Sequence, residues 1–261
     1  MNNINPSKPV ILVIAGHDPC GGAGIQADIE TISATGCQAV TIITALTAQN
    51  TRVINNILPV TPQFFEQQLS TLIEDVNVFA CKIGMIGNSA LVDIIVDALL
   101  KLKVPVVLDP VMLSGSGHIL TDGDLIQRMI RKIFPLTTII TPNSIEAREL
   151  TKTDNLQAAA TDLLDCGCQS VLITGTHENT DEVINTLYMS TRAPLLFSFE
   201  RLPGTYHGSG CTLSAAIASH LALGEDIPGA VKKSLHFTWQ TLKYAIQYGQ
   251  AQSHPDRFYN R

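Results

Sequence analysis

Short, continuously apolar segments alternate with amphipathic segments through most of this chain, and this rhythm restricts the fold more than any other feature. A strand buried on both faces has apolar residues at successive positions, whereas a strand with one solvated face alternates. The continuous pattern occurs at residues 10–15, 38–45, 78–85, 104–111, 137–142 and 170–175. These segments predict the strands of a mostly parallel sheet.

The segments between them have apolar residues at three- and four-residue spacing, which is typical of helices that lie on a sheet. They cover residues 25–35, 62–75, 89–102, 124–134 and 155–167, and two further helices are expected at 211–223 and 227–248. Repeated βα units with right-handed crossovers predict a doubly wound, three-layer α/β/α fold, with an antiparallel edge pair near residues 181–202. Because no Pro/Ser-rich linker or sequence repeat interrupts this pattern, we expect a single domain over residues 1–261.

Composition excludes several classes of protein. The 261 residues include 17 basic and 23 acidic side chains, for a net charge of −6, whereas a nucleic-acid-binding protein is expected to have a basic surface. The apolar run near the N-terminus is about six residues long, too short for a signal sequence or a membrane span. We therefore expect a cytoplasmic globular protein with neither a nucleic-acid nor a membrane partner.

Cysteine spacing gives one candidate reactive residue. The six cysteines form no CxxC pair, and no histidine spacing completes a zinc site, so disulfide and metal frameworks are not expected. Cys211 differs because it follows Gly208, Ser209 and Gly210 directly before an expected helix. Free backbone N–H groups at a helix N-terminus suit a phosphate. The alternative is that the glycines only permit close packing and the cysteine is a small apolar side chain.

The loop after the first expected strand is also rich in glycine. Ligands of doubly wound sheets bind at the carboxyl ends of the strands, and the stretch "GHDPCGGAGIQAD" allows the backbone to approach a ligand closely. Its Asp28 either contacts a ligand or complements the dipole of the following helix. The motifs GxGxxG, GxxxxGK[ST], GxSxG and HExxH are absent, so a dinucleotide site, a P-loop, a serine hydrolase and a zinc protease are not indicated.

Two oxygen-bearing side chains, Asn143 and Glu146, follow another expected strand in "TPNSIEARE". Their spacing places both on one side of a helix start, where oxygen ligands would suit a magnesium ion that bridges nucleotide phosphates. The same N-x-x-E spacing is that of a capping box. Spacing alone favours the cap.

Taken together, these motifs closely resemble a known family. "AGHDPCGGAGIQAD", "TALTAQNT", "KIGM", "LDPVM", "TPNxxEA" and "HGSGCTLSAAIA" occur in this order on the expected strand ends. They resemble the hydroxymethylpyrimidine/phosphomethylpyrimidine kinases of thiamine synthesis, a branch of the ribokinase-like superfamily that also contains pyridoxal kinases. The resemblance runs from about residue 10 to about residue 245. It implies Mg²⁺-dependent transfer of the ATP γ-phosphoryl group to 4-amino-5-hydroxymethyl-2-methylpyrimidine, and then to its monophosphate.

The resemblance also implies a set of site residues. The pyrimidine would contact Gln49, Asp28, Gly16 and Met85. The nucleotide region would contain Asp109, Asn143 and Thr174, with Asn143 and Glu146 serving the magnesium ion. The anion hole would be formed by Gly208, Ser209, Gly210 and Cys211. Expected partners are thus the pyrimidine and ATP, with a possible homodimer.

This sequence departs from the family pattern at three positions. Thr174 stands where many relatives have a lysine, so phosphate charge must be neutralised by magnesium, by the helix N-terminus or by a basic residue from elsewhere. His17 and Ser209 replace common hydroxyl residues but stay polar. Because Thr174 replaces that lysine, a catalytically weak pyrimidine-binding protein is one alternative. A pyridoxal kinase, which shares the scaffold and part of the motifs, is another. An unrelated Rossmann oxidoreductase is disfavoured, because the dinucleotide-binding fingerprint is absent.

Cys211 stands where most of the wider superfamily has an aspartate base. A helix N-terminus favours a thiolate, which can accept the proton of a primary alcohol. A thiol that is neutral beforehand would not repel the phosphate of the monophosphate substrate. We therefore hypothesise that the cysteine lets one site phosphorylate both an alcohol and a phosphate monoester.

Overall fold

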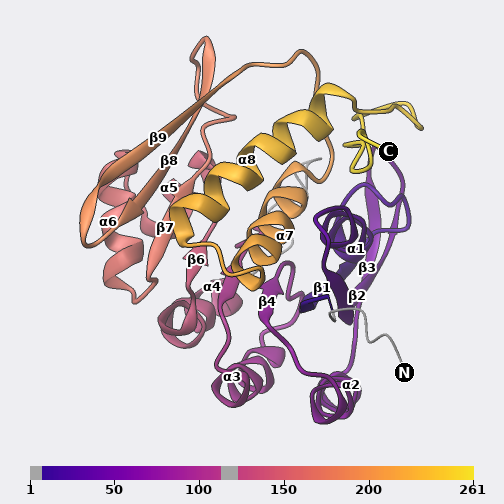
Figure 1. Ribbon diagram of the computed structural model, residues 1–261. Coiled ribbons are helices and arrows are strands. Elements are labelled where there is room, and N and C mark those ends of the chain that lie inside the picture. The colour runs from indigo at the N-terminus through magenta and orange to yellow at the C-terminus, as the bar shows by residue number, and fades with distance from the viewer. Residues whose placement is uncertain (1–7, 113–122) are drawn as a thin grey trace, which may run out of the picture.

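The computed structural model describes residues 8–112 and 123–261. All strands in these ranges belong to one nine-stranded sheet (Figure 1). The strands are β1 Val10–His17, β2 Gln38–Gln49, β3 Ile54–Pro59, β4 Ala80–Ile83, β5 Val106–Leu108, β6 Ile139–Ile140, β7 Ser170–Ile173, β8 Glu182–Met189 and β9 Arg192–Glu200. Their order in the sheet is β3-β2-β1-β4-β5-β6-β7-β8-β9. The six central strands are parallel, and β3, β8 and β9 pair antiparallel at the two edges.

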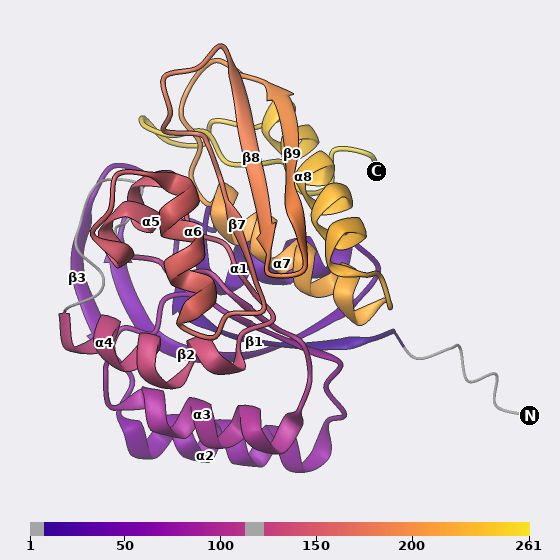
Figure 2. The same cartoon turned by 90° about the vertical axis from the view of Figure 1, so that its left-hand side faces the viewer.

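Helices cover both faces of the sheet and make three layers (Figure 2). The helices are α1 Gly24–Ala34, α2 Pro62–Asp75, α3 Leu91–Leu102, α4 Gly123–Lys132, α5 Ser144–Thr151, α6 Leu156–Asp165, α7 Ser209–Ala222 and α8 Ile227–Lys243, with a short 3-10 helix η1 at Phe134–Leu136. One apolar core joins the sheet to α1, α7 and α8, and the other joins it to α2, α3, α4 and α6. The expected doubly wound fold is confirmed. None of the helices within the described ranges combines the length and apolar character that crossing a bilayer requires.

The predicted elements correspond closely to the observed ones, with two errors at the margins. β8 and β9 form the antiparallel pair expected near residues 181–202. Strand β3 was not predicted because "INNILP" is short, interrupted by two asparagines and mostly exposed at the sheet edge. The last helix was predicted to reach residue 248, but α8 ends at Lys243, and Ile246 instead pairs with His254.

The direction of the winding changes beside β1. The chain passes from β1 outward to β2 and β3, then returns to β4 on the other side of β1. Connections leave the neighbouring strands in opposite directions at such a point, which opens a crevice at the carboxyl ends. The loops that follow β1, β4, β5, β6 and β7 all end at this edge of the sheet.

Two neighbouring phenylalanines on α2 provide a matched test of this packing. Phe65 is 0% exposed in the core, whereas Phe64 is 57% exposed. We expect Phe65→Ala to lower the free energy of unfolding by about 3–5 kcal/mol, because it removes buried apolar atoms and leaves a cavity. Phe64→Ala should change it by about 0.5 kcal/mol or less. Urea denaturation of both variants would measure this, and equal losses would contradict the assigned faces of α2.

Candidate active site

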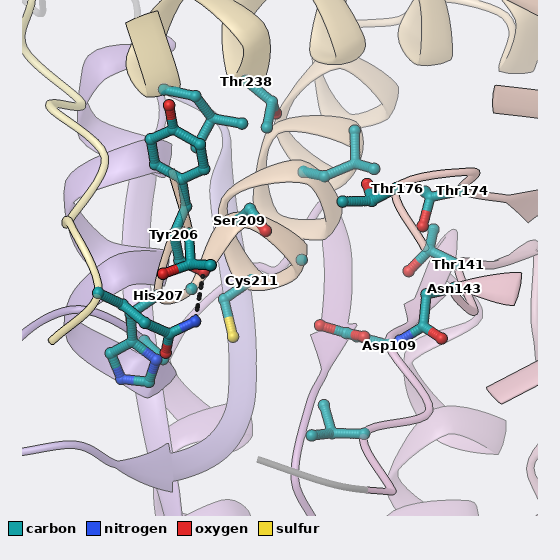
Figure 3. Close-up of a pocket in the computed structure, with 18 of the residues that line it drawn as sticks. Asp109, Thr141, Asn143, Thr174, Thr176, Tyr206, His207, Ser209, Cys211 and Thr238 are labelled. Atoms are coloured by element: carbon teal, nitrogen blue, oxygen red, sulfur yellow. Dashed lines mark hydrogen bonds between the residues drawn. The ribbon is translucent and has the colours of Figure 1, made fainter. Parts of the chain in front are cut away.

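A cavity of about 750 Å³ opens at the carboxyl edge of the sheet, between the strand ends and the N-terminus of α7 (Figure 3). It contains nearly all the residues that the sequence singled out. The lining includes Gly16, Gln49, Met85, Asp109, Asn143, Glu146, Thr174, Gly208, Ser209, Gly210 and Cys211. The candidate residues come from seven elements or loops, so the fold brings together positions that are far apart in the chain.

The first turn of α7 forms one side of the cavity. Gly208 is the N-cap, with a left-handed backbone (φ 81°), and Ser209 and Gly210 begin the helix. A Cβ on Gly208 would lie 1.8 Å from the carbonyl oxygen of Gly22, so only glycine permits this contact. The free N–H groups at the start of α7 therefore face the cavity at a fixed position, as an anion site requires.

Lys82 on β4 is a buried cation of the site that was not predicted. Its Nζ lies 2.9 Å from Asp28, and both side chains are 0% exposed. It also lines the cavity, and although burial lowers its pKa, the nearby carboxylates of Asp28 and Asp109 outweigh that effect and raise it. Lys82 is therefore charged, and it supplies a cation on the same face of the sheet as the α7 N-terminus.

Asp28 occupies a different place from the one that the resemblance implied. Its carboxylate is fully buried against Lys82 and is not part of the cavity lining. It also lies beyond the first turn of α1, so it does not serve as the helix-dipole partner that was the alternative. In the structure Asp28 neutralises the buried lysine, because an unpaired ammonium there would be strongly destabilising.

The Cys211 thiol faces the same space and is predominantly protonated. Its side chain is half-buried at the cavity wall, and burial raises its pKa to about 12. The charge of Lys82 and the Gly24 N–H lower the pKa, whereas the charges of Asp28 and Asp109 raise it further. The helix N-terminus therefore does not produce a standing thiolate at neutral pH. This corrects the expectation that the helix end alone would favour one.

Asp109, directly after β5, is the nearest carboxylate across from α7. Figure 3 shows it opposite Cys211, and its Oδ2 accepts a hydrogen bond from Ser214 at 3.4 Å. Burial raises its pKa to about 6, while Lys82 lowers it. At neutral pH this carboxylate is thus mostly ionised.

Asn143 and Glu146 form the capping box that their spacing favoured. The Asn143 Oδ1 accepts from the Ile145 and Glu146 N–H groups, both at 2.9 Å, and the Glu146 Oε2 accepts from the Asn143 N–H at 3.0 Å. The pKa of Glu146 is raised to about 8 by burial and by the neighbouring Asp109 charge. These two buried carboxylates repel each other, which a bound cation would relieve.

Threonine hydroxyls occupy the region where many relatives have a lysine. Thr174 bridges to Asn143 at the end of β7, and Figure 3 shows Thr141, Thr174 and Thr176 gathered beside Asn143. The nearest arginine in the lining, Arg201, donates to the carbonyl oxygens of residues 176, 178 and 180 at 2.8–3.0 Å. It therefore fixes the loop after β7.

Gly16, Met85 and Gln49 form the other end of the cavity. A Cβ on Gly16 would lie 2.4 Å from the Met85 Cε, so the methionine covers the glycine backbone directly. Gln49 ends β2, and its side-chain amide makes no hydrogen bond to another residue in the described ranges. This end offers an apolar wall and a free amide, which can both donate to and accept from a polar ring edge.

A second unpredicted pair connects the loop after β1 to α7. The His207 Nε2 lies 2.8 Å from the Asp18 Oδ2, and the Asp18 carboxylate also accepts from the N–H groups of Cys20 and Ala23 at 2.8 and 2.9 Å. These contacts hold the pKa of Asp18 down at about 2 despite burial, with the His207 contact as the largest lowering cause. Asp18 is therefore an ionised anchor for the glycine-rich loop.

A doubly wound sheet, with a glycine-rich helix N-terminus facing two carboxylates across a cavity, is the arrangement expected of a phosphotransferase with the ribokinase-like fold. The model of the phosphomethylpyrimidine kinase family matches residues 18–256, and the chain belongs to this family. A hydroxymethylpyrimidine/phosphomethylpyrimidine kinase of Synechococcus elongatus is 34% identical over 257 residues, which cover 96% of this chain and 98% of that relative.

Solved structures agree with this assignment. The phosphomethylpyrimidine kinase of Clostridium difficile 630 is 35% identical, with a TM-score of 0.79 and coverage of 90% of this chain and 100% of that one. The pyridoxal kinase of Staphylococcus aureus, in complex with AMP-PCP and pyridoxal, is 26% identical, with a TM-score of 0.88 and coverage of 98% and 96%. The family and the fold expected from the sequence are therefore confirmed, and the chain is a kinase.

The protonation state of Cys211 can be measured directly. Because the pKa is raised to about 12, the rate of alkylation by iodoacetamide should keep rising with pH through pH 10, as the small thiolate fraction grows. Peptide mass spectrometry would follow Cys211 separately from the other cysteines, and urea-unfolded protein would serve as the control, with an ordinary pKa near about 8.5. A plateau below pH 8 in the folded protein would show a standing thiolate and contradict this assignment.

Proposed function

We propose that this kinase transfers the γ-phosphoryl group of ATP to the hydroxymethyl oxygen of 4-amino-5-hydroxymethyl-2-methylpyrimidine, and then to the resulting monophosphate, giving the diphosphate for thiamine synthesis. The observation that carries the proposal is the two-ended cavity. A helix N-terminus with free N–H groups lies at one side, and a small apolar wall with the Gln49 amide lies at another. The names of the relatives support the same substrate class.

Gln49 recognises the aminopyrimidine in this proposal. Its amide can donate to a ring nitrogen and accept from the exocyclic amine, and Met85 covers the ring against Gly16. Asp28 contributes only through Lys82, because its carboxylate is buried away from the cavity. The choice of substrate thus depends on three uncharged residues, Gln49, Met85 and Gly16.

Lys82 and the α7 N-terminus bind the transferring phosphoryl group. The N–H groups of residues 208–211 supply fixed donors, and Lys82 supplies the positive charge that Thr174 cannot. Phosphoryl transfer requires mainly positioning and charge stabilisation from a protein. We therefore expect an active enzyme despite the missing lysine, and not only a pyrimidine-binding protein.

Two groups can accept the proton of the attacking alcohol. Cys211 does so only through the small thiolate population that Lys82 supports, whereas Asp109 is mostly ionised at neutral pH. A loose transition state demands little of a base, because the alcohol loses its proton late. The neutral thiol beside the anion site keeps the wall next to the monophosphate free of negative charge, which is consistent with the use of both substrates.

Asp109 and Glu146 fit a magnesium ion. Mg²⁺ is commonly held by one or two carboxylates, waters and substrate phosphates. Burial raises the pKa of both carboxyl groups, and the Asp109 charge raises that of Glu146 further. Within the described ranges no cluster of three His, Cys, Asp or Glu residues competes as a protein-only metal site. Asn143 and Glu146 would hold the ion directly or through water, and the ion would supply charge neutralisation at the triphosphate.

A second activity, phosphorylation of pyridoxal, is favoured by one specific finding. The pyridoxal kinase of Staphylococcus aureus matches almost the whole chain at a TM-score of 0.88. Pyridoxal, too, has a hydroxymethyl group on a nitrogen ring. One domain over residues 1–261, a homodimer and a cytoplasmic location remain predictions from the sequence.

Product analysis tests the function. We expect incubation with Mg²⁺-ATP to convert the pyrimidine alcohol to its monophosphate and then to its diphosphate, with stoichiometric ADP, as identified by mass. Pyridoxal is tested in parallel at the same concentration. Phosphorylation of pyridoxal alone would replace the proposal by the alternative, and binding without ADP formation would indicate a catalytically inactive relative.

Glu146→Gln separates the magnesium role from the cap. A glutamine still accepts from the Asn143 N–H, and it replaces an acid whose ionisation burial and Asp109 disfavour, so thermal stability should be unchanged or slightly higher. The Mg²⁺ concentration needed for half-maximal activity should rise, because a carboxylate ligand is lost. A lower melting temperature with an unchanged Mg²⁺ requirement would leave the cap as its sole role.

A further inference from the structure

The segment 252–258, which follows α8, lies against the glycine-rich loop and the start of α7 in the structure. Ser253 forms a bridge with Tyr206, and the His207 N–H donates to the Ser253 carbonyl at 2.9 Å. The Gln252 Nε2 donates to the Tyr206 carbonyl at 3.3 Å. Figure 1 shows this yellow part of the chain beside α1. The backbone of Ser253 therefore pairs with residues 205–207, which lead directly into the start of α7.

Arg257 is the buried centre of this contact. Its side chain is 1% exposed, and its guanidinium makes four hydrogen bonds to groups on three other parts of the chain. Nη2 donates to the Gly22 carbonyl at 2.5 Å and Nη1 to the Gly21 carbonyl at 3.3 Å. Nε donates to the Thr212 hydroxyl at 3.1 Å, and Nη1 also pairs with Glu30 on α1 at 2.9 Å.

These acceptors are the groups that set the geometry of the anion site. The Gly22 carbonyl is the atom that approaches Gly208 so closely that no side chain fits there. Thr212 is on the first turn of α7, and its hydroxyl also donates to the Gly208 carbonyl at 2.9 Å. One planar guanidinium thus contacts both sides of the junction between the glycine loop and α7, which a lysine cannot reproduce because it lacks the fork of donors.

We infer that Arg257 is a positioning residue for phosphoryl transfer. It holds the Gly21–Gly22 turn against the first turn of α7, so that the N–H groups of residues 208–211 stay directed into the cavity. It does not line the cavity and therefore acts through the glycine loop and α7. This inference rests on the proposed function for its kinetic consequence but not for its structural one. The two consequences are measured separately.

The structural readout is the reactivity of Cys211 at a fixed pH. In Arg257→Gln the junction loses the guanidinium, so Cys211 in the same first turn should be alkylated by iodoacetamide faster than in the parent protein. Arg257→Lys should give an intermediate alkylation rate, since a lysine keeps the positive charge but lacks the planar guanidinium with its several N–H donors. Arg261→Gln is the matched control, because the Arg261 guanidinium lies over the Phe258 ring and has no contact with the junction.

The kinetic readout is the division between kcat and KM. Misplacement of the N–H groups should lower kcat on the pyrimidine alcohol by about tenfold or more. The KM values for ATP and for the pyrimidine should stay within about threefold, since the strand-end contacts are intact. Phe65→Leu, in the core on the other face of the sheet, serves as the stability control, and all assays are run well below the lowest melting temperature.

The outcomes distinguish the inference from a purely structural role. Faster Cys211 labelling with a selective loss of kcat supports it. If Arg257→Gln only lowers the melting temperature, as Phe65→Leu does, and leaves labelling and kcat unchanged, the inference is wrong. Should Arg257→Gln not fold, Thr212→Val removes one of the four hydrogen bonds and decides by the same two readouts. If the parent protein shows no kinase activity, the labelling result still decides the structural part.

Discussion

The buried charge of Lys82 is the interaction on which the site depends. Its ammonium faces Asp28 on α1, Cys211 on α7 and Asp109 after β5, so it joins three parts of the chain that pack on one face of the sheet. A buried lysine requires a compensating carboxylate, and Asp28 meets that requirement at 2.9 Å. The same charge lowers the pKa of the Cys211 thiol and of the Asp109 carboxyl group, against the larger effect of burial. Fold stability and phosphate chemistry are therefore coupled at a single side chain.

The central sheet could be predicted from the sequence because its strands are buried on both faces, which makes "VILVIA" or "SVLITG" apolar at successive positions. The edge strand β3 could not, since its two asparagines and its mostly exposed positions interrupt that pattern. Resemblance to a family located the loops at the strand ends. It did not locate contacts that depend on tertiary structure, such as Lys82 with Asp28, 54 residues apart, or His207 with Asp18, 189 apart. A lysine within the otherwise apolar run 78–85 was the one available signal for Lys82.

Asn143 and Glu146 show why spacing alone could not separate a cap from a ligand set. The capping box uses the Glu146 Oε2, while the Met112 N–H donates to Oε1 over a long distance, 3.4 Å. A carboxylate has more acceptor capacity than one cap consumes. Helix capping therefore holds the carboxylate beside Asp109, and the two explanations describe one arrangement rather than competing ones.

The long separation between Gly22 and Arg257 has a consequence for how the protein is made. The two residues are 235 positions apart, so on the ribosome the glycine loop and α1 emerge long before the side chain that joins that loop to α7. Domains of this size begin to fold during synthesis, and contacts between distant segments form last. The sheet can therefore assemble first, while the junction between the glycine loop and α7 reaches its final geometry only once Arg257 has been synthesised and has packed. During that interval the nascent protein would be compact, with the start of α7 less firmly held.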